Sequence, residues 1–336
     1  MANIQYLYNT NYSEYEKSLS SIEQRSLFGQ DFEGKVFFSK NKINPSHSPF
    51  IKNRLEILFS DVNHTRLIQQ IRDQGHIEDN YKIKYIKLTR GDSFAARRNT
   101  LCKEIIGMVK ATPNYTNPDF LYGLTHFQGV WYFGKLLQNS NQWKKHNKRP
   151  YTYSNSLKIT MAKVLVNLAG QGDTTRTLID PCCGAGTVLM EGYFAGYNIT
   201  GSDISWKTAR NARSNLEHFN YNVMVQKLPI QLVENHFDSA IIDLPYGLYS
   251  KITPEEERLI IQNALRISNR TIIVSSKNIL NLLTDEPTKI VDTCACIKSV
   301  NREFTRFIYV CVNDFGKTAS QVLATVDSKR SMPIVL

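Results

Sequence analysis

The second half of the chain alternates between short apolar runs and stretches in which apolar residues recur at helical spacing. The apolar runs have the length of buried strands and lie at Thr177–Asp180, Asn198–Ser202, Ser239–Asp243, Thr271–Ser275 and Phe307–Val312. The helical pattern occurs in Ser156–Ala169, Val188–Phe194, Trp206–Phe219 and Glu255–Ile267. Strands that alternate with helices form βαβ units. The pattern therefore predicts a doubly wound α/β domain with a mostly parallel sheet.

The first half has a weaker pattern. Strands are predicted at Lys35–Phe38 and Tyr81–Leu88, helices at Ile51–Phe59 and Arg66–Gln74, and a hairpin turning at Gln128-Gly129 over Gly123–Gly134. A polar, basic stretch follows and contains Pro150. We therefore predict a ferredoxin-like or accessory segment over residues 1–55, a small α+β domain over 56–135, a basic linker over 136–155 and the α/β domain over 156–336.

A glycine-containing turn follows the first strand of the α/β domain, where open α/β sheets bind their ligands. Its residues are Asp180, Pro181, Cys182, Cys183, Gly184, Ala185, Gly186 and Thr187. Glycines let the backbone approach a ligand closely. Asp203 and Ile204 follow the next strand, and a carboxylate there can accept the hydroxyls of a ribose.

Four interpretations of this turn compete. A dinucleotide site needs a third glycine where Leu189 stands, and a phosphate loop needs a Gly-Lys-Ser/Thr sequence that the turn lacks. The turn could also be structural only. S-adenosylmethionine is favoured, because its zwitterionic methionine end needs no phosphate cradle.

A second motif, Asp243-Leu244-Pro245-Tyr246, follows a buried strand at the same edge of the sheet. Pro245 restricts Leu244 to an extended conformation, so that the Leu244 carbonyl is held rigidly. This carbonyl and the Asp243 carboxylate suit an exocyclic amino group with two N–H donors, and Tyr246 offers a face for stacking a base. Holding both hydrogens would direct the nitrogen lone pair at a methyl donor. The alternative is that Asp243 caps a helix and Pro245 forms an ordinary turn.

Together the two motifs resemble those of the THUMP-containing class I S-adenosylmethionine-dependent RNA guanosine N2-methyltransferases, the group that acts on guanosine 10 of tRNA. The similarity extends from about Gly129 to Val312 and includes Trp131–Lys135, Lys148–Tyr151, Met161–Ala169 and Asn301–Arg306. It implies a seven-stranded methyltransferase sheet, catalysis by Asp243 to Tyr246 on a flipped-out base, and a turn at 301–306 close to the substrate.

The sequence differs from this family in three places. Leu244 replaces a more usual proline. No carboxylate occurs from His218 to Val233, so the cofactor adenine would rely on backbone groups or Gln226. Before residue 136, only the turn at 116–119 and the strand at 129–135 are similar to a THUMP domain, which would make residues 56–135 a degenerate one.

The charge of the chain is uneven. The net charge of +11 divides into +9 for residues 1–150 and +2 for the remainder. This excess predicts an anionic partner, and we expect RNA. The candidate contacts are Lys82, Lys84, Arg97, Arg98, Lys144, Lys145, Arg149 and Arg306. A solvated charged face is the alternative interpretation for each of them.

The sequence further predicts a cytoplasmic protein without a metal site. Its six cysteines form no repeated CxxC pair, and no apolar stretch reaches the length of a membrane span. The predicted function is methylation of guanosine N2 in RNA, with tRNA as the expected substrate and a monomer or weak dimer as the expected state. The alternatives are an rRNA or DNA amino-methyltransferase and a catalytically silent RNA-binding protein. An activating protein partner stays open.

Overall fold

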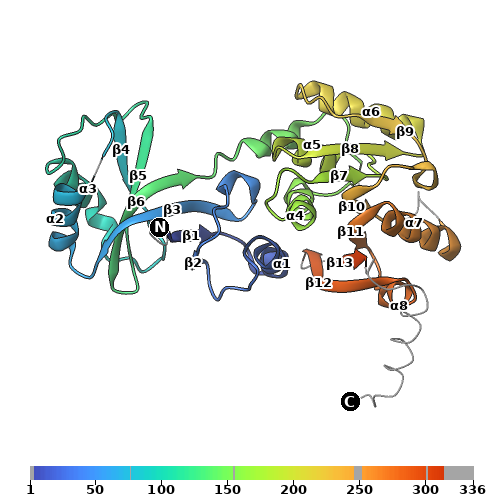
Figure 1. Ribbon diagram of the computed structural model, residues 1–336, viewed down its shortest axis with the longest axis horizontal. Helices are drawn as coiled ribbons and strands as arrows, with labels where there is room; N and C mark the ends of the chain where they lie inside the picture. The colour runs from blue at the N-terminus through green and yellow to red at the C-terminus, as the bar shows by residue number, and fades with distance from the viewer. Residues whose placement is uncertain (1–3, 76, 154–155, 246–251, 300–301, 314–336) are drawn as a thin grey trace, which may run out of the picture. The chain divides into compact units, whose positions relative to one another are not determined.

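The computed structural model describes residues 4–75, 77–153, 156–245, 252–299 and 302–313. Its contacts divide the chain into two compact units. The first comprises residues 1–12 and 27–142, and the second comprises residues 13–26 and 143–336. Each unit has its own sheet (Figure 1). No helix among the described residues has the length and apolar character needed to cross a bilayer.

The first unit contains a six-stranded sheet in the order β2-β1-β3-β6-β5-β4. Its strands are β1 (Tyr6–Thr10), β2 (Val36–Ser39), β3 (Ile51–Asp61), β4 (Tyr81–Tyr85), β5 (Phe120–Phe127) and β6 (Val130–Gln138). All neighbours pair antiparallel except β4 and β5, which are parallel. Helices α2 (His64–Gln74) and α3 (Arg98–Ile106) bury Leu67 and Ile105 against sheet residues such as Tyr122. This unit also has 3-10 turns at Pro45–His47 and Ala95–Arg97.

The hairpin prediction is confirmed and one helix prediction is wrong. Strands β5 and β6 are joined by Gln128 and Gly129, which both have positive φ (51° and 81°), the geometry of a tight hairpin turn. Ile51–Phe59, predicted as a helix, is part of strand β3, because it pairs with β1 on one side and β6 on the other. Strand β3 also continues through the boundary that we expected between residues 55 and 56.

The second unit contains a seven-stranded sheet in the order β12-β13-β11-β10-β7-β8-β9. Its strands are β7 (Thr177–Asp180), β8 (Asn198–Asp203), β9 (Val225–Lys227), β10 (Phe237–Asp243), β11 (Ser268–Ser275), β12 (Thr288–Ser299) and β13 (Arg302–Asn313). All of them run parallel except β13, which is antiparallel to both of its neighbours. The predicted doubly wound, mostly parallel sheet is therefore confirmed.

Helices cover both faces of this sheet (Figure 1). They are α4 (Ile159–Gly170), α5 (Thr187–Phe194), α6 (Trp206–His218), α7 (Pro254–Arg266) and α8 (Leu280–Thr284), with 3-10 turns at Gln142–Lys148 and Ile230–Leu232. Helix α5 contacts both α4 and α6, whereas α7 and α8 bury Ile261 and Leu283 against Ile242 and Ile273 on the sheet. The C-terminal ends of the central strands are left for a ligand.

A short N-terminal segment belongs to the second unit. Residues 13–26 include a 3-10 turn at Glu14–Glu16 and most of helix α1 (Lys17–Phe28). Arg25 donates two hydrogen bonds of 2.8 Å to Asp292, and Asn167 donates one of 2.6 Å to Glu23. The region that we expected to be one accessory segment over residues 1–55 therefore contributes to both units.

Candidate functional site

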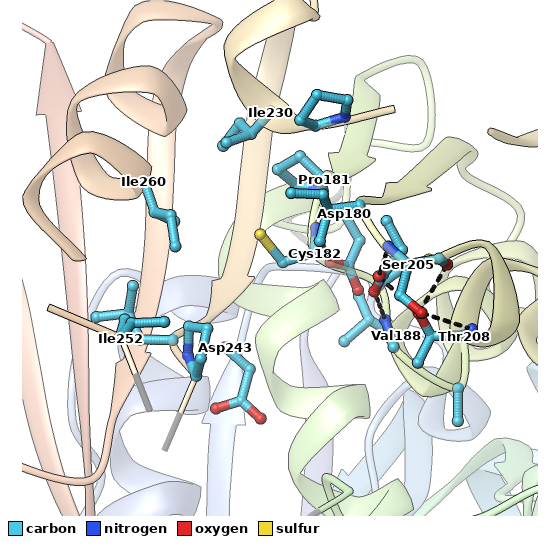
Figure 2. A pocket seen from close by; sticks show the side chains of 18 of the residues that line it. Asp180, Pro181, Cys182, Val188, Ser205, Thr208, Ile230, Asp243, Ile252 and Ile260 are labelled. Atoms are coloured by element: carbon cyan, nitrogen blue, oxygen red, sulfur yellow. Dashed lines mark hydrogen bonds between the residues drawn. The ribbon is translucent and has the colours of Figure 1, made fainter. Parts of the chain in front are cut away.

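A cavity of about 590 Å³ lies at the carboxyl ends of β7, β8 and β10 (Figure 2). In the sheet, β7 lies between β8, the next strand of the chain, and β10. The cavity therefore occupies the switch point of the sheet, where the strand order reverses. The predicted site residues that line it are Asp180, Pro181, Cys182, Gly184, Ala185, Thr187, Asp203, Ile204, Asp243, Leu244 and Pro245. The fold thus brings both sequence motifs into one place.

The turn after β7 depends on its two glycines. Gly184 and Gly186 have φ of 51° and 75°, where other residues are strained. A Cβ on Gly184 would meet nothing within 4 Å, so this backbone faces open space in the cavity. A Cβ on Gly186 would come within 3.1 Å of the Ala212 Cβ, and Gly186 does not line the cavity. The backbone at Gly184 is therefore open to the cavity, whereas Gly186 lets α5 begin close to α6.

Asp203 organises the neighbouring edge of the cavity. Its Oδ2 accepts the Gly184 N–H at 2.9 Å, and its Oδ1 accepts the Ser205 N–H at 2.9 Å and the Thr208 hydroxyl at 2.6 Å. The carboxylate therefore ties the glycine turn to the start of α6. Figure 2 labels Ser205 and Thr208 at this end of the helix. Carboxylate oxygens have further acceptor positions beyond these bonds.

Asp180 is a buried acid at the start of the glycine turn. Its side chain is 5% exposed, and its Oδ1 accepts the Cys182 N–H at 3.3 Å. Burial, with a smaller contribution from the charges of Asp203 and Asp243, raises its pKa well above the ordinary value for aspartate. Four carboxyl groups thus line the cavity, those of Asp180, Asp203, Asp243 and Glu256. A ligand that carries positive charge would favour their ionised forms.

Asp243 ends strand β10 at the cavity. Its Oδ1 is buried and has no hydrogen-bond partner among the described residues. Burial raises the pKa of Asp243 to about 7, and the charge of Arg306 partly opposes this rise. The next residue, Leu244, is 2% exposed and donates its N–H to the Val274 carbonyl at 2.9 Å. A buried acceptor without a partner is costly for stability and is typical of a site that awaits a donor.

We expect Asp243→Asn to stabilise the protein at neutral and alkaline pH. The folded state holds the Asp243 proton up to about pH 7, whereas the unfolded state releases it near the ordinary aspartate pKa of 3.8. The folded state therefore binds more protons between these values, and the wild-type protein loses up to about 4 kcal/mol of stability as the pH rises through this window.

Urea unfolding of the wild-type protein and of Asp243→Asn from pH 4 to pH 8 measures this effect. The variant should gain stability relative to the wild-type protein as the pH rises, with the full difference present above about pH 7. An equal difference at all pH values would contradict a raised pKa for Asp243.

Two predicted site residues, Gln226 and Arg306, have another place in the structure. Tyr246 lies outside the described residues. Gln226 is exposed on β9 and does not line the cavity; instead the segment Pro229 to Gln231 does. Arg306 is 4% exposed on β13, opposite Cys296, and so does not present a surface cation to RNA. Arg302–Arg306, expected as a turn, is part of β13 itself.

Sequence reasoning missed much of the cavity wall. The additional lining residues are Tyr153, Ser156, Leu157, Cys183, Val188, Ser205, Thr208, Pro229, Ile230, Gln231, Ile252, Glu256, Leu259 and Ile260. Ser205 had a readable signal, because a serine directly before a helical pattern indicates an N-cap. Its Oγ accepts the Thr208 N–H. The others come from separate elements that only the fold brings together.

The remaining predicted RNA contacts are basic residues with varied exposure. In the first unit, Lys82 and Lys84 donate to the Tyr115 carbonyl and the Gln138 side chain, and Arg97 and Arg98 are exposed. In the second unit, Lys144 and Lys145 are exposed in the 3-10 turn at Gln142–Lys148. Arg149 is half-buried, donates to the His146 carbonyl and the Thr152 hydroxyl, and has a pKa lowered by burial.

Comparison with known families finds a match within the second unit. Residues 146–280 match the family UPF0020, which is described as an RMKL-like methyltransferase domain. This match contains the glycine turn, Asp203 and Asp243, the residues around the cavity. Residues 146–280 of the second unit are therefore similar to the RMKL-like methyltransferase domain.

Two curated relatives are tRNA (guanine(10)-N2)-dimethyltransferases. The protein from Methanothermobacter thermautotrophicus is 30% identical over 122 residues, which cover 35% of this chain and 36% of that protein. The protein from Methanocaldococcus jannaschii is 27% identical over 203 residues, which cover 54% of this chain and 57% of that protein. The chain thus matches less than two thirds of the length of either relative.

Among solved structures, TrmN from Thermus thermophilus aligns with 92% of this chain and 99% of its own, with 13% identity and a TM-score of 0.45. Similarity at this level does not bear on function.

Proposed function

We propose that the protein transfers a methyl group from S-adenosylmethionine to the exocyclic N2 of guanosine in RNA, with tRNA as the substrate. The observation that carries the proposal is Asp243, which ends strand β10 at the cavity. Its Oδ1 is buried and has no hydrogen-bond partner among the residues that the structure describes. The family of the domain and the named activity of the two archaeal relatives support it.

The cavity fits S-adenosylmethionine by its chemistry. This cofactor carries a positive sulfonium, and Asp180, Asp203 and Asp243 give the cavity an acidic lining. Asp203 would accept the ribose hydroxyls, and the open face of Gly184 would admit the methionine end. The segment Pro229 to Gln231 would border the adenine, in place of the carboxylate that is missing there. When bound, the cofactor supplies an electrophilic methyl group.

The acceptor side is formed by Asp243, Leu244 and Pro245. The amino nitrogen of guanine is a poor nucleophile, because its lone pair is delocalised into the ring. The Asp243 carboxylate and the Leu244 carbonyl would each accept one N–H, which holds the amino group and leaves its lone pair directed at the methyl group. Asp243 Oδ1 can then hold the proton that the nitrogen loses. Since only the ionised carboxyl accepts in this way, activity should rise with pH through about 7.

RNA binding is assigned to the basic residues of both units. Lys82, Lys84, Arg97 and Arg98 in the first unit, together with Lys144, Lys145 and Arg149 in the second, would contact phosphates. Under this proposal residues 56–135 of the first unit form a degenerate THUMP-like RNA-binding domain.

Methyl transfer to separated nucleic acids tests the acceptor class. The protein is incubated with labelled S-adenosylmethionine and with tRNA, rRNA or DNA from a strain that lacks its gene. We expect label in the tRNA fraction alone. Label in rRNA or DNA would keep the mechanism and replace the substrate. Binding of S-adenosylhomocysteine without transfer to any fraction would contradict the proposed acceptor.

A further inference from the structure

Two asparagines on helix α6 hold the segment that precedes the methyltransferase sheet. Asn211 and Asn215 lie four residues apart and therefore on the same face of the helix. Asn215 is fully buried. Its Oδ1 accepts the Tyr151 N–H, and its Nδ2 donates to the Tyr151 carbonyl, both at 2.8 Å. Asn211 donates to the Tyr153 hydroxyl. The segment from Tyr151 to Tyr153 is thus fixed at its backbone and at a side chain.

The same asparagine also reaches the glycine turn. Asn215 Nδ2 donates a second bond of 2.8 Å to the carbonyl of Ala185. Ala185 and Tyr153 both line the cavity. One buried amide therefore connects the glycine turn with Tyr151, two residues before the lining residue Tyr153 and more than 30 residues away in the sequence. Three hydrogen bonds use the oxygen and both amide hydrogens of Asn215, which leaves no donor of this side chain unpaired.

The held segment is not part of the sheet. Tyr153, Ser156 and Leu157 form a wall of the cavity, although they precede α4, the first helix of the βαβ units. The Ser156 Oγ accepts the Tyr153 N–H at 3.0 Å, and the Ser156 N–H donates to the Tyr153 carbonyl at 3.0 Å. Within the described part of this segment, Tyr151 and Tyr153 are hydrogen-bonded to helix α6.

We propose that Asn211 and Asn215 are positioning residues, an amide clasp that holds the Tyr151–Tyr153 segment against the glycine turn and thereby retains the bound cofactor. The inference rests on the proposed function, because it takes S-adenosylmethionine as the ligand of the cavity. The clasp makes no contact with the reacting atoms. It fixes the position of Tyr153 when the protein folds. Cofactor binding then does not have to order this part of the cavity wall, and the entropy lost on binding is smaller.

The test measures the affinity for S-adenosylhomocysteine by calorimetry, with no methyl transfer involved. Asn211→Ala and Tyr153→Phe each remove the bond between the Asn211 amide and the Tyr153 hydroxyl. Loss of one hydrogen bond predicts an affinity that is lower by about threefold to tenfold for each variant. Because both changes remove the same bond, the double variant should bind no more weakly than either single variant. Asn211→Asp should retain nearly the wild-type affinity, since its carboxylate can accept from the Tyr153 hydroxyl.

Asn215→Ala should reduce the affinity further, because it leaves Tyr151 and Ala185 without their partner. Its matched control is Asn167→Ala, which removes another buried amide of the second unit, one that binds Glu23 and does not line the cavity. This control should keep the wild-type affinity. Thermal unfolding of all the variants shows whether they are folded at the temperature of the binding measurement.

The outcomes are distinct. Wild-type affinity in Asn211→Ala and Tyr153→Phe, or additive losses in their double variant, would overturn the clasp and leave the proposed function in place. A wild-type protein that binds no S-adenosylhomocysteine would overturn the proposed cofactor, and the role of the clasp with it. Loss of affinity in Asn167→Ala equal to that in Asn215→Ala would show a general effect of stability and would also overturn the clasp.

Discussion

Asp243→Ala is expected to slow methyl transfer by at least about 100-fold, the contribution that a positioned proton acceptor makes to an enzymatic step. The variant removes the Asp243 carboxylate, which ends strand β10 at the cavity. Among the described residues, the buried Oδ1 of this carboxylate has no hydrogen-bond partner. The acceptor amino group would lose one of its two anchoring oxygens and its proton acceptor. Single-turnover transfer at saturating S-adenosylmethionine measures the chemical step directly.

Cofactor binding provides the control for this variant. Since Asp243 lies on the acceptor side of the cavity, the affinity of Asp243→Ala for S-adenosylhomocysteine should stay within a few-fold of the wild-type value. A variant that binds the cofactor analogue normally and transfers methyl groups at the wild-type rate would refute the role of Asp243.

Asp203→Ala is expected to weaken binding of S-adenosylhomocysteine by about 100-fold, which corresponds to two lost hydrogen bonds to a charged group. The carboxylate accepts from Gly184, Ser205 and Thr208, and it would also accept the ribose hydroxyls. Its removal therefore releases the glycine turn as well as the ligand.

The matched control is Glu217→Ala, which removes an exposed acid near the opposite end of α6, away from the cavity. Calorimetric titration of both variants should show wild-type affinity for Glu217→Ala. An affinity of Asp203→Ala within threefold of the wild-type value would contradict the assignment of this edge of the cavity to the ribose.

The fold of the second unit could be predicted from the sequence because its signals are local. A buried parallel strand is a short apolar run, and the ligand edge follows from the carboxyl end of such a strand, so that the pattern alone placed Asp180, Asp203 and Asp243 at one edge of the sheet. Strand β3 could not be placed, because its conformation is set by pairing with β1 and β6, which lie far away in the sequence. Non-local pairing of this kind overrides local propensity.

The burial of polar and charged residues was the other feature that could not be predicted from the sequence. Arg306 resembled a surface cation in the sequence, but the antiparallel pairing of β13 with β11 and β12 encloses it. The basic stretch over 136–155 appeared to be a linker, yet His146 is fully buried and hydrogen-bonded to Glu191 and Tyr221. Polar composition alone does not distinguish a solvated linker from a segment whose polar groups are paired with side chains of a folded domain.

The most direct measurement identifies the methylated nucleoside. Transfer RNA from a strain that lacks the gene is treated with the protein and S-adenosylmethionine, digested to nucleosides and analysed by mass spectrometry. The account predicts new N2-methylated guanosine in the reaction with the wild-type protein and none in the reaction with Asp243→Ala. A methyl group on adenosine N6, on a cytosine or on a ring nitrogen of guanine would contradict it.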